Sequence, residues 1–153
     1  MQDRFKFRFY DKDKKIMVKP PDEMSESEWR RCCNIYGCDV WHFSIVLALT
    51  KILDYFDNTS FIIMQCTSLK DKNNNLIYEG DIMQVEFENE FKNETHIAVV
   101  EYDKKDTGFG CKFNPKSDIL YSLSPMESRG LIIGNIYENP ELLKKFNNIN
   151  QEN

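Results

Sequence analysis

Long hydrophobic runs are missing from this chain of 153 residues. Its longest apolar stretch, residues 45–49, falls far short of the roughly 20 residues that a membrane-spanning helix needs. Charged side chains also interrupt the first eight residues, where a secretory signal would place an apolar segment. We therefore expect a soluble, cytoplasmic protein with no membrane association.

Histidines are also few, and the sequence has no glycine loop of the kind that binds phosphate. Only His42 and His96 are present, and neither belongs to a recognisable Ser/His/Asp or Cys/His motif. The glycines at 108 and 110 are too close together for a phosphate loop, and no helix signal follows them. Glu79 and Asp81 flank a glycine and are more simply solvated turn residues than a metal-binding or acid/base pair. The sequence therefore predicts no enzymatic activity and no cofactor.

Basic charge is in deficit, because 20 Lys and Arg face 25 Asp and Glu for a net charge of −5. That balance argues against a general nucleic-acid-coating protein, which is usually basic. Residues 1–19 are an exception, with seven basic and three acidic side chains. In the strand expected there, Arg4, Lys6 and Arg8 alternate with three phenylalanines. This basic face could contact phosphates, so nucleic-acid binding is the second hypothesis. The simpler interpretation buries the phenylalanines and leaves the basic face solvated.

The cysteines number five, an odd count that favours free thiols in a chain without an export signal. Cys32, Cys33, Cys38 and His42 form a cluster of soft ligands. Structural zinc sites usually use pairs of ligands at regular spacing, and adjacent cysteines point in different directions on a helix or strand. We therefore predict no metal site.

Short alternating runs between polar turns dominate residues 61–137. Turn-forming residues occupy positions 71–75, 79–81 and 104–108, and the runs between them alternate in polarity with a period of two. Such spacing favours a small antiparallel barrel or roll. Its predicted inward side chains are Val85, Phe87, Val99, Phe109 and Ile133.

The flanking segments predict a hairpin and helices. Residues 4–18 resemble two strands around a polar turn, and residues 25–28 resemble a helix start. Helical spacing over residues 41–56 predicts an amphipathic helix, whose apolar stripe either covers the sheet or packs on a second copy of the chain. The stripe consists of Trp41, Ile45, Leu49, Ile52 and Phe56. Asn139, Pro140 and Glu141 predict a C-terminal helix start, with Asn139 as its cap.

One candidate surface for a protein partner is acidic. Glu86, Glu88 and Glu90 share one face of an expected strand. A concentrated negative face can steer a basic partner, although solubility alone also explains such a face.

Three stretches of the chain resemble the YopX family of phage and prophage proteins. They lie in residues 6–12, in residues 64–82 with the sequence MQCTSLKDKN and IYEGDI, and in residues 100–143, which end with IGNIYENPELL. Ser68 and Asn74 stand where the family usually has glycine. Asparagine tolerates a positive φ, and the serine suggests that position 68 does not strictly need glycine.

The resemblance implies an α+β, mainly β fold with a small antiparallel SH3-like barrel in the C-terminal half, an N-terminal β segment and a helical insertion. The expected divisions are 1–60, 61–146 and a tail at 147–153. The resemblance also implies a phage or prophage origin, hence the cytoplasm of a bacterial host, but it carries over no catalytic or binding residues. We expect a non-enzymatic accessory protein that binds a host or phage protein or assembles as a homo-oligomer.

Overall fold

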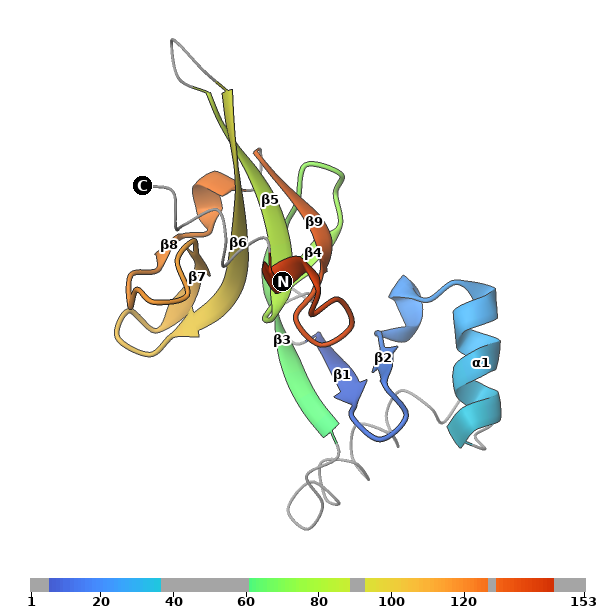
Figure 1. Cartoon of the computed structure of the whole chain (residues 1–153). Helices are drawn as coiled ribbons and strands as arrows, with labels where there is room; N and C mark the ends of the chain where they lie inside the picture. The colour runs from blue at the N-terminus through green and yellow to red at the C-terminus, as the bar shows by residue number, and fades with distance from the viewer. Residues whose placement is uncertain (1–5, 37–60, 89–92, 127–128, 145–153) are drawn as a thin grey trace. The chain divides into compact units, whose positions relative to one another are not determined.

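The computed structural model describes residues 6–36, 61–88, 93–126 and 129–144 (Figure 1). Strands dominate these ranges. The chain divides into two compact units, one formed by Lys6–Met64 and the other by the remaining residues. The two units are described separately below.

The N-terminal unit begins with a β-hairpin, as predicted. Strands β1 (Phe7–Asp11) and β2 (Ile16–Val18) pair antiparallel around an exposed polar turn. The buried carboxylate of Asp11 organises this turn, because its Oδ1 accepts the backbone N–H groups of Asp13 and Lys14 at 3.0 and 2.9 Å. An aspartate that bonds the backbone two and three residues ahead favours the turn locally.

A short 3-10 helix, η2 (Pro21–Glu23), then leads to helix α1 (Glu26–Tyr36). The predicted helix start is confirmed as a capping box, in which Ser25 N–H donates to Glu28 and Glu28 N–H donates to Ser25 Oγ. Lys19 Nζ lies 2.7 Å from Glu28 Oε1, and this contact with the hydrogen bonds from Ser25 lowers the pKa of Glu28 to about 2.

One face of α1 forms the small core of this unit. Cys32 is buried together with Val18 of β2, and the half-buried Trp29 packs against them. The helix therefore covers the hairpin with its apolar side. The predicted amphipathic helix at residues 41–56 lies outside the described residues.

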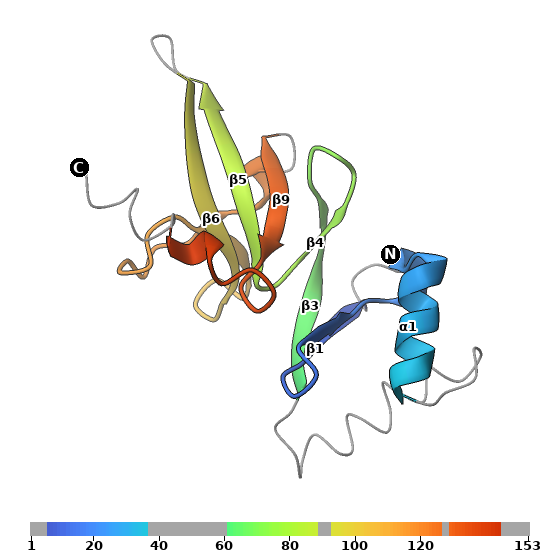
Figure 2. The same cartoon turned by 45° about the vertical axis from the view of Figure 1, so that its right-hand side comes forward.

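The second unit contains a five-stranded antiparallel sheet in the order β8-β7-β6-β5-β9. Its strands are β5 (Asp81–Glu88), β6 (Asn93–Asp103), β7 (Gly108–Lys112), β8 (Tyr121–Ser122) and β9 (Gly130–Asn135). Strand β3 (Phe61–Lys70) pairs antiparallel with β4 (Leu76–Tyr78), and a 3-10 helix, η3 (Ser124–Met126), follows β8. Figure 2 shows the long, twisted β5–β6 pair. One sheet curls into a half-barrel, so the predicted fold class is confirmed.

Both faces of the five-stranded sheet are covered, and this overturns part of the predicted core. One cluster, called the Met83 cluster, contains Ile77, Met83, Val85, Ala98, Val100, Cys111 and Leu123. The other, called the Val99 cluster, contains Ile82, Ile97 and Val99, with Ile133, Ile136, Leu142 and Leu143 packed against it. Val85, Phe87 and Phe109 belong with the first cluster as predicted. Val99 and Ile133 instead point to the opposite face, because neighbouring residues of a strand alternate between faces.

The YopX-like stretch at residues 64–82 contains the turn between β3 and β4. Asp71 Oδ1 accepts the N–H groups of Asn73 and Asn75, and its Oδ2 accepts the N–H of Ile132 in β9 at 3.1 Å. This carboxylate is buried and joins a turn to a strand far away in sequence. Its role in the described structure is therefore structural.

A second buried carboxylate, Asp81, supports the turn between β4 and β5. It accepts the N–H of Tyr78 at 2.8 Å and an amide N–H of the Asn135 side chain at 3.4 Å. Gly80 in this turn has φ +80°, a conformation that favours glycine. Asp81 therefore supports the turn, but it is buried, whereas the sequence predicted a solvated residue. Its bonds to Tyr78 and Asn135 explain the difference, because they hold the carboxylate inside the fold.

A helical turn begins after Pro140, as predicted, but Asn139 has a different partner from the one expected. Its side-chain oxygen accepts the N–H of Asn135 at 3.1 Å, a residue that precedes the helical turn. The close approach of this segment to β9 explains the difference. A Cβ on Gly134 would lie only 2.7 Å from Asn139 Oδ1 and 2.8 Å from Leu142 Cδ1. Tertiary packing thus draws the carboxamide back toward the sheet.

Candidate binding pocket

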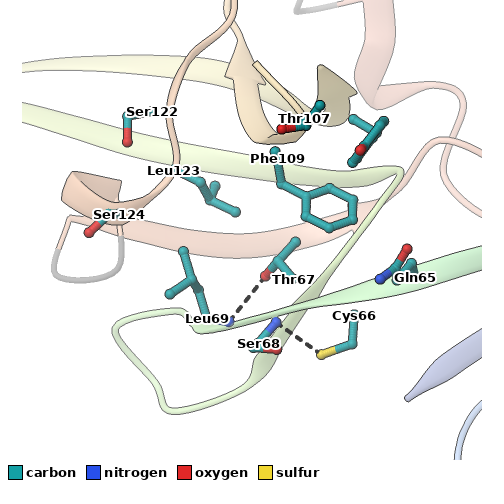
Figure 3. Close-up of a pocket in the computed structure, with 12 residues that line it drawn as sticks. Gln65, Cys66, Thr67, Ser68, Leu69, Thr107, Phe109, Ser122, Leu123 and Ser124 are labelled. Carbon is teal, nitrogen blue, oxygen red and sulfur yellow. Dashed lines mark hydrogen bonds between the residues drawn. The ribbon is translucent and has the colours of Figure 1, made fainter. Parts of the chain in front are cut away.

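A cavity of about 490 Å³ opens within the second unit. Its wall comes from three separate stretches: the end of β3, the β6–β7 hairpin, and the segment from β8 into η3 (Figure 3). The lining residues are Gln65, Cys66, Thr67, Ser68, Leu69, Tyr102, Thr107, Gly108, Phe109, Ser122, Leu123 and Ser124. Its volume is within the usual range of small-ligand sites.

An irregularity in β3 forms one wall of this pocket. Cys66 pairs with Tyr78 and Lys70 pairs with Leu76, so β3 has more residues between these two pairs than β4 does. Such a bulge re-aims side chains and strengthens the local twist. Thr67 stabilises it, because its hydroxyl donates to the carbonyl of Ile77 at 2.9 Å and accepts the N–H of Leu69 at 3.2 Å.

Ser68 occupies the middle of this bulge in an unfavourable conformation. Its φ is 68°, in the left-handed region that costs an ordinary residue about 1–2 kcal/mol. Its N–H donates to the sulfur of Cys66 at 3.4 Å, whereas its buried hydroxyl oxygen has no hydrogen-bond partner among the described residues. Ser68 therefore combines backbone strain with an unsatisfied polar atom at the pocket wall.

The pocket lining is polar but uncharged. Serine and threonine hydroxyls and one glutamine amide alternate with leucine and phenylalanine, and among the described residues that line it there is no Asp, Glu, His, Lys or Arg. Hydroxyls and amides can both donate and accept hydrogen bonds. This donor and acceptor set suits a neutral ligand better than an ionic one, because burying an uncompensated charge is costly.

Two aromatic side chains, Tyr102 and Phe109, line the pocket, and a second aromatic pair, Tyr121 and Phe113, lies outside the lining. Tyr102 is 42% exposed and meets Phe109 edge to face at 5.3 Å between ring centroids. Tyr121 is also exposed and meets Phe113 at 5.5 Å. Exposed tyrosines supply apolar area with a polar tip and are common in protein interfaces.

The basic residues predicted for the N-terminal strand do not form a free basic face in the described residues. Lys6 Nζ lies 2.6 Å from Asp22 and 3.6 Å from Glu23. Arg8 is half-buried on β1, and Arg4 lies outside the described residues. Phe9 packs in the small core of this unit as expected, but Phe7 is 39% exposed.

The predicted acidic stripe is only partly described. Glu86 is exposed on β5, and its Oε1 lies 3.1 Å from Lys72 Nζ. Glu88 ends β5, but its side chain is not described, and Glu90 lies outside the described residues. The structure therefore places one of the three carboxylates and pairs it with a lysine.

Two other groups of predicted residues lie partly or wholly outside the described ranges. The apolar stripe from Trp41 to Phe56 is entirely outside them, as are Cys38 and His42. Cys32, Cys33, Cys66 and Cys111 are described, and all four are free thiols. Within the described ranges, no group of three or more metal-ligating side chains comes together.

The sequence analysis did not single out the pocket. One sequence feature marked Ser68 as unusual, since it stands where the resembled family usually has glycine. No sequence feature marked Tyr102 or Thr107 as a pocket residue. Phe109 was predicted as an inward residue of the barrel, and it packs against the Met83 cluster while also lining the pocket. Only the folded chain brings these distant stretches together.

The comparison with protein families identifies the chain. The family described as YopX protein matches residues 6–144. The chain belongs to the YopX family. The match covers the hairpin, α1 and the strands of the second unit, so the predicted family resemblance is confirmed.

A solved structure supports the same assignment. The chain is similar to protein EF1440 from Enterococcus faecalis, with 26% sequence identity and a TM-score of 0.52 over 90% of this chain and 96% of that one. No curated protein matches the chain. Among the described residues, no helix is long and apolar enough to cross a membrane.

Proposed function

We propose that this YopX-family chain is a non-enzymatic accessory protein of a phage or prophage that acts by binding a partner protein. One observation carries the proposal: the pocket is lined by the aromatic rings of Tyr102 and Phe109 and, among the described residues, by no charged side chain and no histidine. General acid–base catalysis most often uses histidine or a carboxylate, and phosphate recognition most often uses lysine or arginine. Association through aromatic and neutral polar contacts needs none of these.

The surface around the pocket has the composition of a protein interface. Tyr102 and Tyr121 are both exposed, and each contacts a further aromatic ring. Tyrosine is enriched among the residues that contribute most to protein binding. The partner is a host protein, another phage protein or a second copy of this chain.

Nucleic-acid binding through the N-terminal strand has less support. Lys6 is engaged by two carboxylates, and the net charge of the chain is −5. Since phosphate contacts dominate such binding, these features favour a protein partner.

The test uses two exposed aromatic residues of similar exposure in different units. Tyr102→Ser removes the pocket rim, and Phe7→Ser is the matched control at 39% exposure on β1. Parent and variants, each shown to be folded by circular dichroism, are immobilised and exposed to lysate of an infected host, and captured proteins are quantified by mass spectrometry.

We expect the parent and Phe7→Ser to retain the same protein. Tyr102→Ser should lose about tenfold or more of this retention, the effect of removing a dominant interface residue. Equal retention by the two variants would contradict the proposal, as would retention no greater than that of an unrelated folded protein.

A further inference from the structure

We infer that a row of aromatic side chains on the five-stranded sheet recognises an arginine of the partner protein, and that Glu94 pairs with its guanidinium. This inference rests on the proposed function, because it names the group that the partner presents. The surface consists of Phe87, His96, Phe113 and Tyr121, called the aromatic row, together with Glu94. It is separate from the pocket, because none of these five residues lines the cavity.

The rings of the aromatic row contact one another across neighbouring strands. The ring centroid of Phe87 lies 5.3 Å from that of His96 and 5.6 Å from that of Phe113. The centroid of Phe113 lies 5.5 Å from that of Tyr121, and all these contacts are edge to face, a preferred arrangement of aromatic pairs. The row therefore runs without a break from β5 to the edge strand β8.

A partner can reach this surface from solvent. Tyr121 is 51% exposed, and the side chains of His96 and Glu94 are 34% and 41% exposed. Phe87 and Phe113 are half-buried, because they pack against the Met83 cluster. The core thus holds part of the row in place before a partner arrives, which lowers the entropy cost of binding.

Strand pairing places the carboxylate of Glu94 beside the rings. Glu94 in β6 is the direct cross-strand partner of Phe87 in β5, and such partners lie on the same face of a sheet. The Nε2 atom of His96 lies 3.3 Å from Oε2 of Glu94. An ionised carboxylate offers about four acceptor positions, so Glu94 can bind a guanidinium while it contacts His96.

The charges on this face favour a cation over an anion. Neighbouring residues of a strand alternate between faces, and the described residues of β5–β8 on the side of Phe87 include no lysine or arginine. Lys112 of β7 belongs to the opposite face, where its Nζ lies 3.4 Å from Glu101. Single-stranded nucleic acid needs a positively charged groove beside the stacking rings. A phosphate here would meet the carboxylate of Glu94 instead.

Arginine fits this combination better than lysine does. Its guanidinium is planar, stacks on aromatic faces and forms two parallel hydrogen bonds with a carboxylate. Lysine carries a compact and strongly hydrated ammonium group. The methylene stem of an arginine also covers apolar surface while its charged head stays in water or at an ion pair. The aromatic row and Glu94 together offer a site for each part of this side chain.

The test titrates the full, ¹⁵N-labelled chain with capped tripeptides and follows the amide resonances by NMR. The probe is leucine–arginine–leucine, and its matched analogues carry citrulline or lysine at the centre. Citrulline keeps the shape of arginine but has no charge. We expect saturable shifts at His96, Phe113 and Tyr121, and an affinity for the arginine probe about fivefold to tenfold above that for the citrulline probe. The lysine probe should bind between these two.

Two pairs of variants locate the recognition on this surface. Glu94→Gln should weaken the arginine probe by about threefold to fivefold and leave the citrulline probe unchanged, because it removes only a charge. Glu86→Gln is the matched control, since Glu86 is 51% exposed and lies on the other face of β5. Tyr121→Ser should weaken the arginine probe by about threefold, whereas Tyr102→Ser, at the pocket, should leave it unchanged.

Equal affinity for the arginine and citrulline probes would overturn the inference, as would unchanged arginine affinity in Glu94→Gln or shifts confined to residues outside the aromatic row. Tighter binding of a short single-stranded thymidine oligonucleotide would also overturn it. So would a shift of the row's resonances when the free protein is diluted, because a second copy of the chain would then cover the row.

The two proposals can fail separately. If Tyr102-dependent capture of a protein persists after one of these results, the proposed function stands without the recognition of arginine. Binding of the arginine probe at the aromatic row without such capture would contradict the proposed function alone.

Discussion

Two neighbouring regions of the second unit hold a residue in the same backbone conformation, but they differ in whether its hydrogen-bonding groups have partners. The turn at residues 71–75 and the β3 bulge each hold a non-glycine residue at φ 68°, Asn74 and Ser68 respectively. In the turn, Asn74 N–H donates to the carbonyl of Asp71, and the buried carboxylate of Asp71 accepts further bonds from its neighbours. In the bulge, the Ser68 hydroxyl has no partner among the described residues.

The difference separates a turn whose hydrogen bonds are satisfied from a bulge that carries strain. Asparagine visits the left-handed region more readily than other non-glycine residues, so the turn is compatible with its sequence. Serine has no such preference, and its unpaired hydroxyl adds a second cost. The turn at residues 71–75 therefore stabilises the fold, whereas the β3 bulge holds a strained residue whose hydroxyl is unpaired among the described residues.

Removing the Asp71 carboxylate from the turn at residues 71–75 should have the largest effect on stability. Asp71→Ala removes the acceptor for the N–H groups of Asn73, Asn75 and Ile132. Because these bonds go to a buried charged group, we expect the free energy of unfolding to fall by about 3 kcal/mol or more. Urea denaturation followed by circular dichroism measures the change.

The matched control for Asp71→Ala is another aspartate in a turn. Asp103 Oδ1 accepts the N–H groups of Lys105 and Asp106, but this turn is exposed to solvent. Water can replace a lost acceptor there, so Asp103→Ala should cost about 1 kcal/mol or less. Equal costs for the two variants would show that burial of the Asp71 turn is not what matters.

Relieving the backbone strain at Ser68 should stabilise the protein, by less than the loss of Asp71 destabilises it. Ser68→Gly removes the Cβ penalty at positive φ and the unpaired hydroxyl, partly offset by the greater entropy of glycine in the unfolded chain. We expect the free energy of unfolding to rise by about 1 kcal/mol. Asn74→Gly should change it by less than about 0.5 kcal/mol. Destabilisation by Ser68→Gly in the same urea experiment would contradict the strain argument.

Glu28 in the N-terminal unit is another carboxylate whose hydrogen-bond partners are close in sequence, and its contribution to stability depends on pH. The pKa of Glu28 is lowered from 4.5 to about 2 by Lys19 and by hydrogen bonds from Ser25. A lowered pKa means that its stabilisation is full above pH 4.5 and is lost as the pH falls toward 2. The side chain is 44% exposed, so its contribution should be only about 1 kcal/mol or less.

Two measurements test the Glu28 prediction. The carboxyl ¹³C resonance of Glu28 should titrate with a midpoint near 2. The difference in stability between the parent and Glu28→Gln should also shrink as the pH is lowered through this range. A midpoint at the ordinary value of 4.5 would show that the capping box and the lysine do not stabilise the charged form.

Thiol labelling gives the subtlest test, because it measures local opening without changing the fold. Burial raises the pKa of Cys111 to about 12, so little reactive thiolate forms until the sheet unfolds. Cys66 is also buried, but it lies at the strained bulge. We expect alkylation, followed by mass spectrometry, to modify Cys66 before Cys111 and more slowly in Ser68→Gly. Simultaneous modification of both thiols would indicate that the bulge does not open on its own.

The hairpin turns were predictable because their chemistry is local. Asp11 and Asp103 each bond to backbone groups two and three residues ahead, so short polar stretches sufficed to locate these turns. The start of α1 was predictable for the same reason. Ser25 and Glu28 are three residues apart and bond to each other, and Lys19, which donates to Glu28, is nine residues away.

Faces and partners across the fold were harder to predict. Val99 and Ile133 were assigned to the same interior as Val85, yet they pack on the opposite side of the sheet. Asn139 was assigned as a helix cap, yet its side chain bonds back to Asn135. In each case the polarity pattern was correct, but it did not say which of two apolar environments a side chain would enter.

The residue order alone was enough to establish the YopX-family resemblance, the mainly β class and the positions of the local turns, because these depend on residue types within a few positions of one another. Tertiary structure alone decided that Asp71 would bond to Ile132 and that residues 65–69, 102–109 and 122–124 would surround one pocket. The physical reason is distance along the chain. A contact between residues far apart in sequence forms only when the whole sheet closes, so no local pattern encodes the cavity beside Ser68.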